Sequence, residues 1–183
     1  MSEEHMREKG APERGYLHVY TGNGKGKTTA ALGLALRAAG AGMRVFFAQF
    51  IKGMKYSEIR ALERLDDCIS VRQYGRGCFI DGAPAPEDID AAKAGIDEIR
   101  LACTRESFDL VILDEAAIAC HFKLFSAAEL IDVIRSIPPR SEIVVTGRYA
   151  PDELTQTADL VTEMKEIKHY FTGGVQARKG IEC

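Results

Sequence analysis

The sequence predicts an α/β fold in which helices flank a mostly parallel central sheet. Short apolar runs rich in β-branched residues alternate with longer segments of helical periodicity, which is typical of repeated strand–helix–strand units. With 183 residues, 46% of them hydrophobic, the chain is long enough for one domain with a substantial core. We therefore expect a single domain over residues 16–183, preceded by a charged, flexible arm over residues 1–15.

Each element follows from its local pattern. Strands are predicted at the apolar runs 16–21, 44–50, 69–74, 108–115, 142–146 and 160–165. Helices are predicted over 28–41, 57–65, 87–105, 126–137 and 151–157, where the residues have helical spacing or start and stop signals. The segment 75–86 is rich in glycine and proline and is expected to be a loop that faces a ligand.

The segment between the first strand and the first helix indicates phosphate binding. It matches the pattern G-x-x-x-x-G-K-[ST] except at the first position, which is Thr21. Its glycines allow backbone N–H groups to surround a polyphosphate at the positive end of the following helix. Lys27 adds a cation, and the hydroxyl of Thr28 is suited to bind Mg²⁺. The alternative is a glycine-rich turn that only starts a helix; the flanking strand and helix favour a P-loop NTPase (RecA-like) architecture.

Two acids follow the predicted strand 108–115. Asp114 and Glu115 are suited to hold Mg²⁺ directly or through water, although acids also end strands where a chain emerges into solvent. Because neighbouring side chains of a strand point to opposite sides, we expect only one of the two to face the metal. These acids, the glycine loop and the segments 49–53, 75–86 and 147–148 all follow strands, so they should share the ligand-binding edge of the sheet.

Composition argues against several other classes of protein. The formal net charge of −3 gives no general attraction to nucleic acid or to an anionic membrane. No apolar run approaches the roughly 20 residues that span a bilayer, and the first fifteen residues have no apolar stretch of a secretory signal. The five cysteines are scattered, which indicates neither a zinc site nor a disulfide framework. A cytoplasmic protein is the simplest interpretation.

Five short motifs together resemble a known family. They occur in the order TGNGKGKTTA (21–30), QFIKG (49–53), LDE (113–115), TGR (146–148) and KH followed by GV.A..GIE (168–182). The chain resembles the ATP:corrinoid adenosyltransferases of the P-loop class over nearly everything from residue 16 onward. The resemblance implies transfer of the 5′-deoxyadenosyl group of ATP to Co(I) of a reduced corrinoid, which forms adenosylcobalamin and releases triphosphate. It also implies that ATP lies reversed in the loop, and Thr21 matches the family's own loop.

The resemblance also implies roles for particular residues. The expected catalytic residues are Lys27, Thr28 and Glu115, and the expected metal ligands are Thr28, Asp114 and Glu115. The expected ATP-binding residues are Gly22, Asn23, Gly24, Lys25, Gly26, Lys27, Thr28, Thr29, Arg37 and Arg148. Arg37 lies nine residues after Thr28, roughly 13 Å along an ideal helix, so direct contact with phosphate is not expected from geometry.

The expected corrinoid-binding residues are Cys78, Phe79, Ile80 and Lys52. Some relatives carry Phe and Trp at the positions of Cys78 and Ile80, and this chain has no Trp. Ordinary loop residues packed on the domain are the alternative interpretation of Phe79 and Ile80. The implied partners are ATP, a cob(I)alamin or cob(I)inamide-type corrinoid, an electron-donating reductase and a second copy of the chain in a homodimer.

Two other functions remain open at this point. A P-loop kinase or ATPase would cleave the terminal phosphate of ATP, but no candidate catalytic base is found in the sequence. A non-catalytic ATP-binding module is the second alternative. Co(I) is itself a strong nucleophile, so adenosyl transfer needs no protein base and agrees with this sequence.

Overall fold

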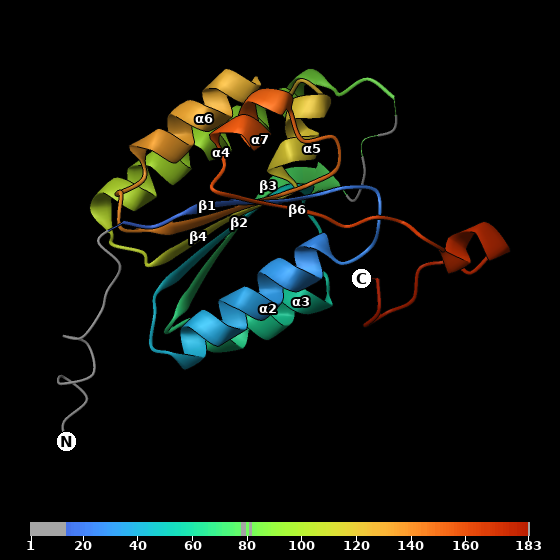
Figure 1. Ribbon diagram of the computed structural model, residues 1–183, viewed down its shortest axis with the longest axis horizontal. Coiled ribbons are helices and arrows are strands. Elements are labelled where there is room, and N and C mark those ends of the chain that lie inside the picture. The colour runs from blue at the N-terminus through green and yellow to red at the C-terminus, as the bar shows by residue number, and fades with distance from the viewer. Residues whose placement is uncertain (1–13, 78–79, 81, 183) are drawn as a thin grey trace.

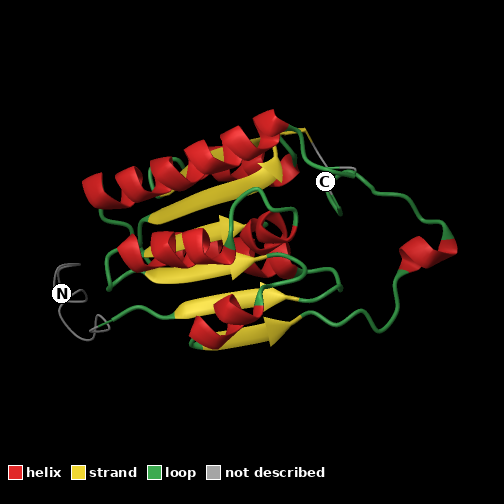
Figure 2. Cartoon of the chain, turned by 90° about the horizontal axis from the view of Figure 1, so that it is seen from above, coloured by secondary structure: helices red, strands yellow, loops and turns green. Residues whose placement is uncertain are grey.

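The computed structural model describes residues 14–77, 80 and 82–182 and confirms the predicted fold class. Six parallel strands form one sheet in the order β3-β2-β4-β5-β1-β6. They span Leu17–Thr21 (β1), Val45–Lys52 (β2), Ile69–Gly77 (β3), Leu110–Asp114 (β4), Glu142–Thr146 (β5) and Leu160–Glu163 (β6). Figure 2 shows the strand arrows pointing the same way, so their carboxyl ends share one edge.

Helices cover both faces of the sheet (Figure 1). Helices α2 (Lys27–Gly40) and α3 (Ser57–Leu62) lie on one face. The other face carries α4 (Pro86–Arg105), α5 (Ala116–His121), α6 (Ala127–Ser136) and α7 (Asp152–Thr157). Two short 3-10 helices, η1 (Glu63–Leu65) and η2 (Tyr170–Gly173), complete the described elements.

The core lies in two layers because alternate side chains of each buried strand point to opposite faces. In β2, Phe46, Ala48 and Phe50 belong to the cluster under α4 and α6. Val45 and Phe47 belong to the cluster under α2 and α3. All five are buried almost completely, which explains why this strand is a continuous apolar run.

The structure corrects several predicted boundaries. β3 continues to Gly77 and α4 begins at Pro86, so the predicted loop 75–86 is shorter at both ends. β4 ends at Asp114, and Glu115 begins a turn into α5, a helix that the sequence patterns did not predict. The N-cap of α5 is Glu115, which is not one of the residues that signal the start of a helix, and the turn into it contains no glycine. Among the described residues, no helix is both long and apolar enough to cross a bilayer.

Candidate active site

The glycine loop leaves β1 at Thr21 and enters α2 at Lys27, as the motif predicted within one residue. Thr21 is still part of the strand, so the first motif position needs no glycine here. The backbone of Met164, directly after β6, accepts the Gly24 N–H at 2.6 Å and donates to the Thr21 carbonyl at 2.8 Å. A Cβ atom on Gly22 or Gly24 would lie only 2.6 Å from the Met164 oxygen, so these positions require glycine for close approach.

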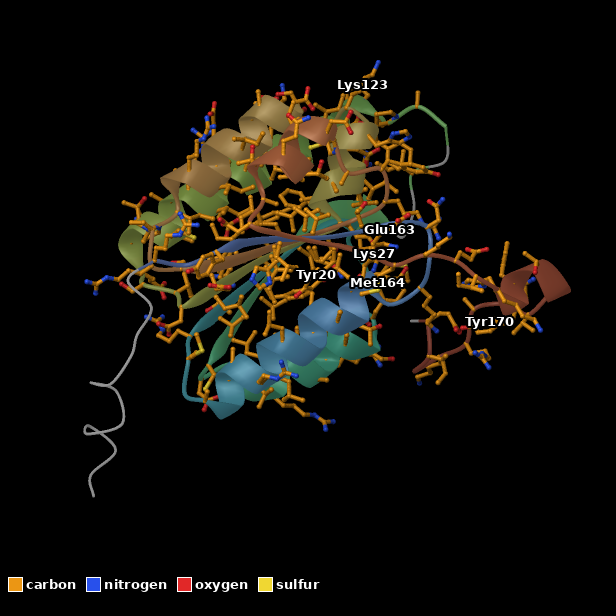
Figure 3. The ribbon with its side chains drawn as sticks, viewed as in Figure 1. Tyr20, Lys27, Lys123, Glu163, Met164 and Tyr170 are labelled. Atoms are coloured by element: carbon orange, nitrogen blue, oxygen red, sulfur yellow. The ribbon has the colours of Figure 1, made fainter. Side chains whose placement is uncertain are left out.

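Lys27 lies at the centre of this loop. Its Nζ donates to the carbonyls of Gly22 at 2.7 Å and Gly24 at 2.8 Å, and the side chain is only 8% exposed. An ammonium group has three donors, so one remains for a ligand. Burial lowers the pKa of Lys27, the positive charge of Arg148 lowers it further, and the charge of Glu115 opposes the shift. Figure 3 places Lys27 close to Met164, beyond the end of the sheet.

The beginning of α2 suits an anion. This 14-residue helix has no side-chain hydrogen bond at its N-cap and no acidic residue in its first turn. Its first-turn N–H groups and the positive end of its dipole therefore have neither a capping side chain nor a first-turn carboxylate to compensate them. A phosphate group at this position would receive both contributions.

The two acids at the end of β4 differ in their surroundings. Asp114 is fully buried, and its carboxylate accepts bonds from Gln49 Nε2 at 2.9 Å and Thr146 Oγ1 at 2.6 Å. Glu115 has a side chain 20% exposed and a positive φ of 60°. Burial, and after it the charge of Asp114, raise the pKa of Glu115.

Basic groups balance these acids at the same edge. Lys52 Nζ, at the end of β2, lies 3.8 Å from a Glu115 carboxylate oxygen. Lys52, Lys27 and Arg148 each lower the pKa of Glu115 and so act against its burial. Three cations and two acids thus give the cluster a small positive charge, which favours a polyanion in the loop.

The C-terminal segment reaches back to the glycine loop from outside. Lys25 Nζ donates to Tyr170 Oη at 2.9 Å and to Glu182 Oε1 at 2.6 Å. Arg178 also donates to the Glu182 carboxylate and lies over the Tyr170 ring, 4.9 Å from its centroid. We call Lys25, Tyr170, Arg178 and Glu182 the tail cluster. Figure 3 shows Tyr170 on the segment that projects beyond the carboxyl edge of the sheet.

The structure brings most of the predicted site residues to one edge. Lys27, Asp114 and Glu115 lie close enough for their charges to interact, together with Lys52 and Arg148. Thr28 is half-buried at the start of α2, and Asn23, Lys25 and Thr29 are exposed around it.

The structure does not bring the remaining predicted residues into this group. Arg37 is exposed in the last turn of α2, at the far end of the helix from the loop, where its charge acts on Tyr20. Its assignment to ATP rests on the resemblance alone. Cys78 and Phe79 fall outside the described residues, whereas Ile80 is half-buried and packs against the core.

Comparison with known proteins assigns the family. A family model described as ATP:corrinoid adenosyltransferase BtuR/CobO/CobP matches residues 13–183. The chain belongs to the ATP:corrinoid adenosyltransferase family. A corrinoid adenosyltransferase of Pseudomonas aeruginosa is 36% identical over 171 residues, which are 93% of this chain and 84% of that relative. One from Escherichia coli (strain K12) is 33% identical over 170 residues, covering 93% of this chain and 86% of the relative.

A solved structure supports the fold of this adenosyltransferase-family chain. The flagellar accessory protein FlaH of Methanocaldococcus jannaschii superimposes with a TM-score of 0.57, covering 82% of this chain and 71% of that protein. Its sequence is only 12% identical, so this likeness concerns the fold alone.

Sequence reasoning gave no role to several side chains at the edge. Gln49 and Thr146 lie in recognised motifs, but their contacts with Asp114 depend on how neighbouring strands pair. A signal was present in β2, because Gln49 interrupts the otherwise apolar run Val45–Phe50. Tyr170, Arg178 and Glu182 are separated from Lys25 by more than 140 residues in sequence, so local patterns do not reveal the tail cluster.

Proposed function

We propose that the protein transfers the 5′-deoxyadenosyl group of ATP to Co(I) of a reduced corrinoid, forming adenosylcobalamin and releasing triphosphate. The observation that carries this proposal is the family membership over residues 13–183, joined to a glycine loop whose surroundings favour a polyanion. The triphosphate is the leaving group in this reaction, so a site that stabilises its charge lowers the barrier.

The bond changes place few demands on protein side chains. Co(I) supplies an electron pair to C5′ of ATP, a Co–C bond forms, and the C5′–O bond breaks with its electron pair leaving on triphosphate. The cobalt becomes a Co(III) alkyl, and no proton has to be removed from the nucleophile. This agrees with the lack of an obvious catalytic base in the sequence. The protein's tasks are to align cobalt with C5′ and to neutralise the leaving group.

The donors at the site fit Mg²⁺. The hydroxyl of Thr28 and the carboxylates after β4 are hard oxygen ligands, and Mg²⁺ commonly combines one or two such ligands with phosphate oxygens and water. When bound, the ion would neutralise part of the triphosphate charge. Glu115 is the better direct ligand, because it is partly exposed, while both oxygens of Asp114 already accept protein hydrogen bonds. We assign Asp114 to a contact through water.

The remaining residues divide between the two substrates. Lys27 and the backbone of the loop residues Gly22–Gly26 would surround the triphosphate together with Thr28 and Thr29. Arg148 and Lys52 would add positive charge at the ends of β5 and β2. We propose Cys78, Phe79, Ile80 and Lys52 as the corrinoid side of the site, because the first three come directly after β3 in the sequence and β3 ends at Gly77. Arg37 is proposed as an ATP-binding residue on the basis of the resemblance alone.

Partners and location follow from the chemistry. Co(I) must be generated by reduction, and we propose a separate electron-donating reductase. The use of ATP favours the cytoplasm. We also propose a homodimer, as the resemblance implies, and the apolar side chains of Leu160 and Val161 on edge strand β6 are exposed enough to take part in it, at 42% and 47%. Light scattering would measure the molecular mass in solution and so test for the homodimer.

One incubation tests the proposed reaction. The protein is mixed with ATP, Mg²⁺ and chemically reduced cob(I)alamin, and the mixture is examined for a light-sensitive alkyl-cobalt spectrum and for inorganic triphosphate. Formation of both in equal amounts supports adenosyl transfer. ADP or free phosphate without an alkyl-cobalt product would show that the protein is a P-loop phosphohydrolase or kinase instead. ATP binding without any product would show that the protein is a non-catalytic ATP-binding module.

A further inference from the structure

A continuous line of polar side chains crosses four neighbouring strands at their carboxyl ends. Gln73 on β3 donates to Gln49 Oε1 at 2.8 Å, and Gln49 on β2 donates to Asp114 at 2.9 Å. Thr146 on β5 donates its hydroxyl to the other Asp114 oxygen at 2.6 Å. Gln49 pairs in register with both Gln73 and Asp114, so the sheet itself aligns these groups. We call Gln73, Gln49, Asp114 and Thr146 the strand-end ladder.

The direction of each hydrogen bond in the ladder is determined. An ionised carboxylate only accepts hydrogen bonds, so Gln49 must present its NH₂ to Asp114 and its oxygen to Gln73. Gln73 Nε2 also donates to the Met54 carbonyl at 3.0 Å, which fixes the outer end. Gln49, Asp114 and Thr146 are all 0% exposed, so water does not compete for these bonds.

Thr146 connects the ladder to the second acid. While its hydroxyl hydrogen goes to Asp114, its oxygen accepts the Glu115 backbone N–H at 3.0 Å. Glu115 is in the left-handed region with a φ of 60°, which a residue with a Cβ atom rarely adopts without support. From this turn the Glu115 carboxylate lies 3.8 Å from Lys52 Nζ and makes no capping hydrogen bond to α5. One threonine hydroxyl therefore holds both acids.

We infer that Gln49 and Thr146 are positioning residues for the magnesium–triphosphate part of the reaction. They fix the carboxylate of Asp114 from both sides, and Thr146 also fixes the backbone turn from which Glu115 reaches the site. Neither residue is expected to touch a substrate, because Asp114 lies between them and both are fully buried. The inference rests on the proposed function, in which the two acids serve the metal bound to triphosphate.

The sharpest test compares two substitutions at one position. Thr146→Val keeps the shape of the side chain and removes the hydroxyl, whereas Thr146→Ser keeps the hydroxyl. Isothermal titration calorimetry with ATP and no corrinoid, once in Mg²⁺ and once in EDTA, measures how much the metal increases ATP affinity. We call this increase the magnesium gain. We expect Thr146→Val to reduce this gain by about 10- to 100-fold, with affinity in EDTA unchanged and kcat lowered similarly. Thr146→Ser should restore most of the gain.

Further variants make the test independent of folding problems. Gln49→Leu should give the same pattern as Thr146→Val, since it removes the other bond to Asp114. Gln73→Leu changes a half-buried side chain that touches Gln49 but not Asp114, and should reduce the magnesium gain by a few-fold. The matched control is Gln156→Leu on the exposed surface of α7, which should leave affinity and turnover unchanged. Thermal unfolding of each variant reports whether the fold survives.

Several outcomes would overturn the inference. It is wrong if folded Thr146→Val and Thr146→Ser have the same magnesium gain, or if Gln73→Leu resembles Gln156→Leu. It is also wrong if Mg²⁺ does not increase the ATP affinity of the unmodified protein. Failure of the proposed function would be recognised separately, because it would appear as the absence of alkyl-cobalt product from the unmodified protein. The binding measurements use no corrinoid and would remain interpretable.

Discussion

The strand-end ladder and the tail cluster are stabilised by different physical means. Three of the four ladder side chains, Gln49, Asp114 and Thr146, are fully buried on adjacent strands of the sheet, so the two bonds to Asp114 exclude water. The tail cluster consists of side chains at the surface, and its Lys25 is 38% exposed. Removing a partner from a buried network leaves an unsatisfied group, whereas water replaces a lost partner at the surface. Substitutions of buried site residues at the sheet edge should therefore have large effects on activity, and substitutions in the tail cluster should have small ones.

The largest effect is expected for Lys27→Ala. The variant removes the buried ammonium group that would stabilise the leaving triphosphate, and we expect kcat to fall by about 10³-fold. Stopped assays of alkyl-cobalt formation measure the change, and circular dichroism verifies the fold. Lys25→Ala, two residues away and exposed, is the matched control and should retain most of the activity. Equal losses in the two variants would contradict the distinction between the buried and exposed sides.

The second prediction concerns Glu115→Gln. The amide has the same shape but lacks the negative charge that we assign to the metal, so turnover should fall by about 10²-fold and need more Mg²⁺ for half-maximal rate. Initial rates over a magnesium titration provide the measurement. Glu153→Gln on the exposed surface of α7 controls for the loss of one charge. An unchanged magnesium requirement would remove Glu115 from the metal site and favour Asp114.

The third prediction tests the close approach of Met164 to the loop. A methyl group at Gly24 would lie 2.6 Å from the Met164 oxygen, so Gly24→Ala should lower the free energy of unfolding by about 1–3 kcal/mol and weaken ATP binding. Gly33→Ala is the control, because that position in α2 has nothing within 4 Å of the added carbon. It should raise stability by about 0.5–1 kcal/mol, since alanine favours a helix more than glycine does. Urea unfolding compares the two, and a stable Gly24→Ala variant would contradict the close contact.

The difference between the ladder and the tail cluster also shows how much of the fold and of the site could be predicted from the sequence. Continuous apolar runs such as Val45–Phe50 identify buried parallel strands, and parallel strands bring their carboxyl ends to one edge, so the location of the site follows from the elements. The glycine loop was placed within one residue of its structure. The pairing of Gln49 with Asp114 was not predictable, because it depends on which strands become neighbours and in which register.

Two other features of the structure could not be predicted from local sequence patterns. The helix α5 follows β4 through Glu115 in a left-handed conformation, where sequence rules expect glycine or asparagine. That conformation is stabilised by Thr146, a residue 31 positions away. The tail cluster similarly joins Lys25 to Glu182 across 157 positions. In both cases a distant side chain decides the local structure.

The contact between the tail cluster and the glycine loop should be insensitive to moderate changes of pH. Hydrogen bonds from Arg178 first, and then from Lys25 and Tyr170, lower the pKa of Glu182. A carboxylate with a lowered pKa in the folded protein contributes its stabilisation above the ordinary value of about 4.3, and loses it as pH falls through the lowered value. The contact should therefore be unchanged between about pH 8 and pH 5. Hydrogen exchange of residues 166–182 at several pH values, corrected for the intrinsic rate, measures this, and a progressive loss of protection toward pH 5 would contradict it.

The smallest effect is expected for Glu182→Gln. The amide removes the charge that Lys25 and Arg178 share, so the segment after residue 165 should detach more often and be cleaved by trypsin a few times faster. Because these bonds lie at the surface and compete with water, ATP affinity should change by less than about fivefold. Glu166→Gln, in an exposed part of the same segment, should change neither quantity. A loss of ATP affinity as large as that of Thr146→Val would mean that the tail is part of the triphosphate site rather than a contact on its outer surface.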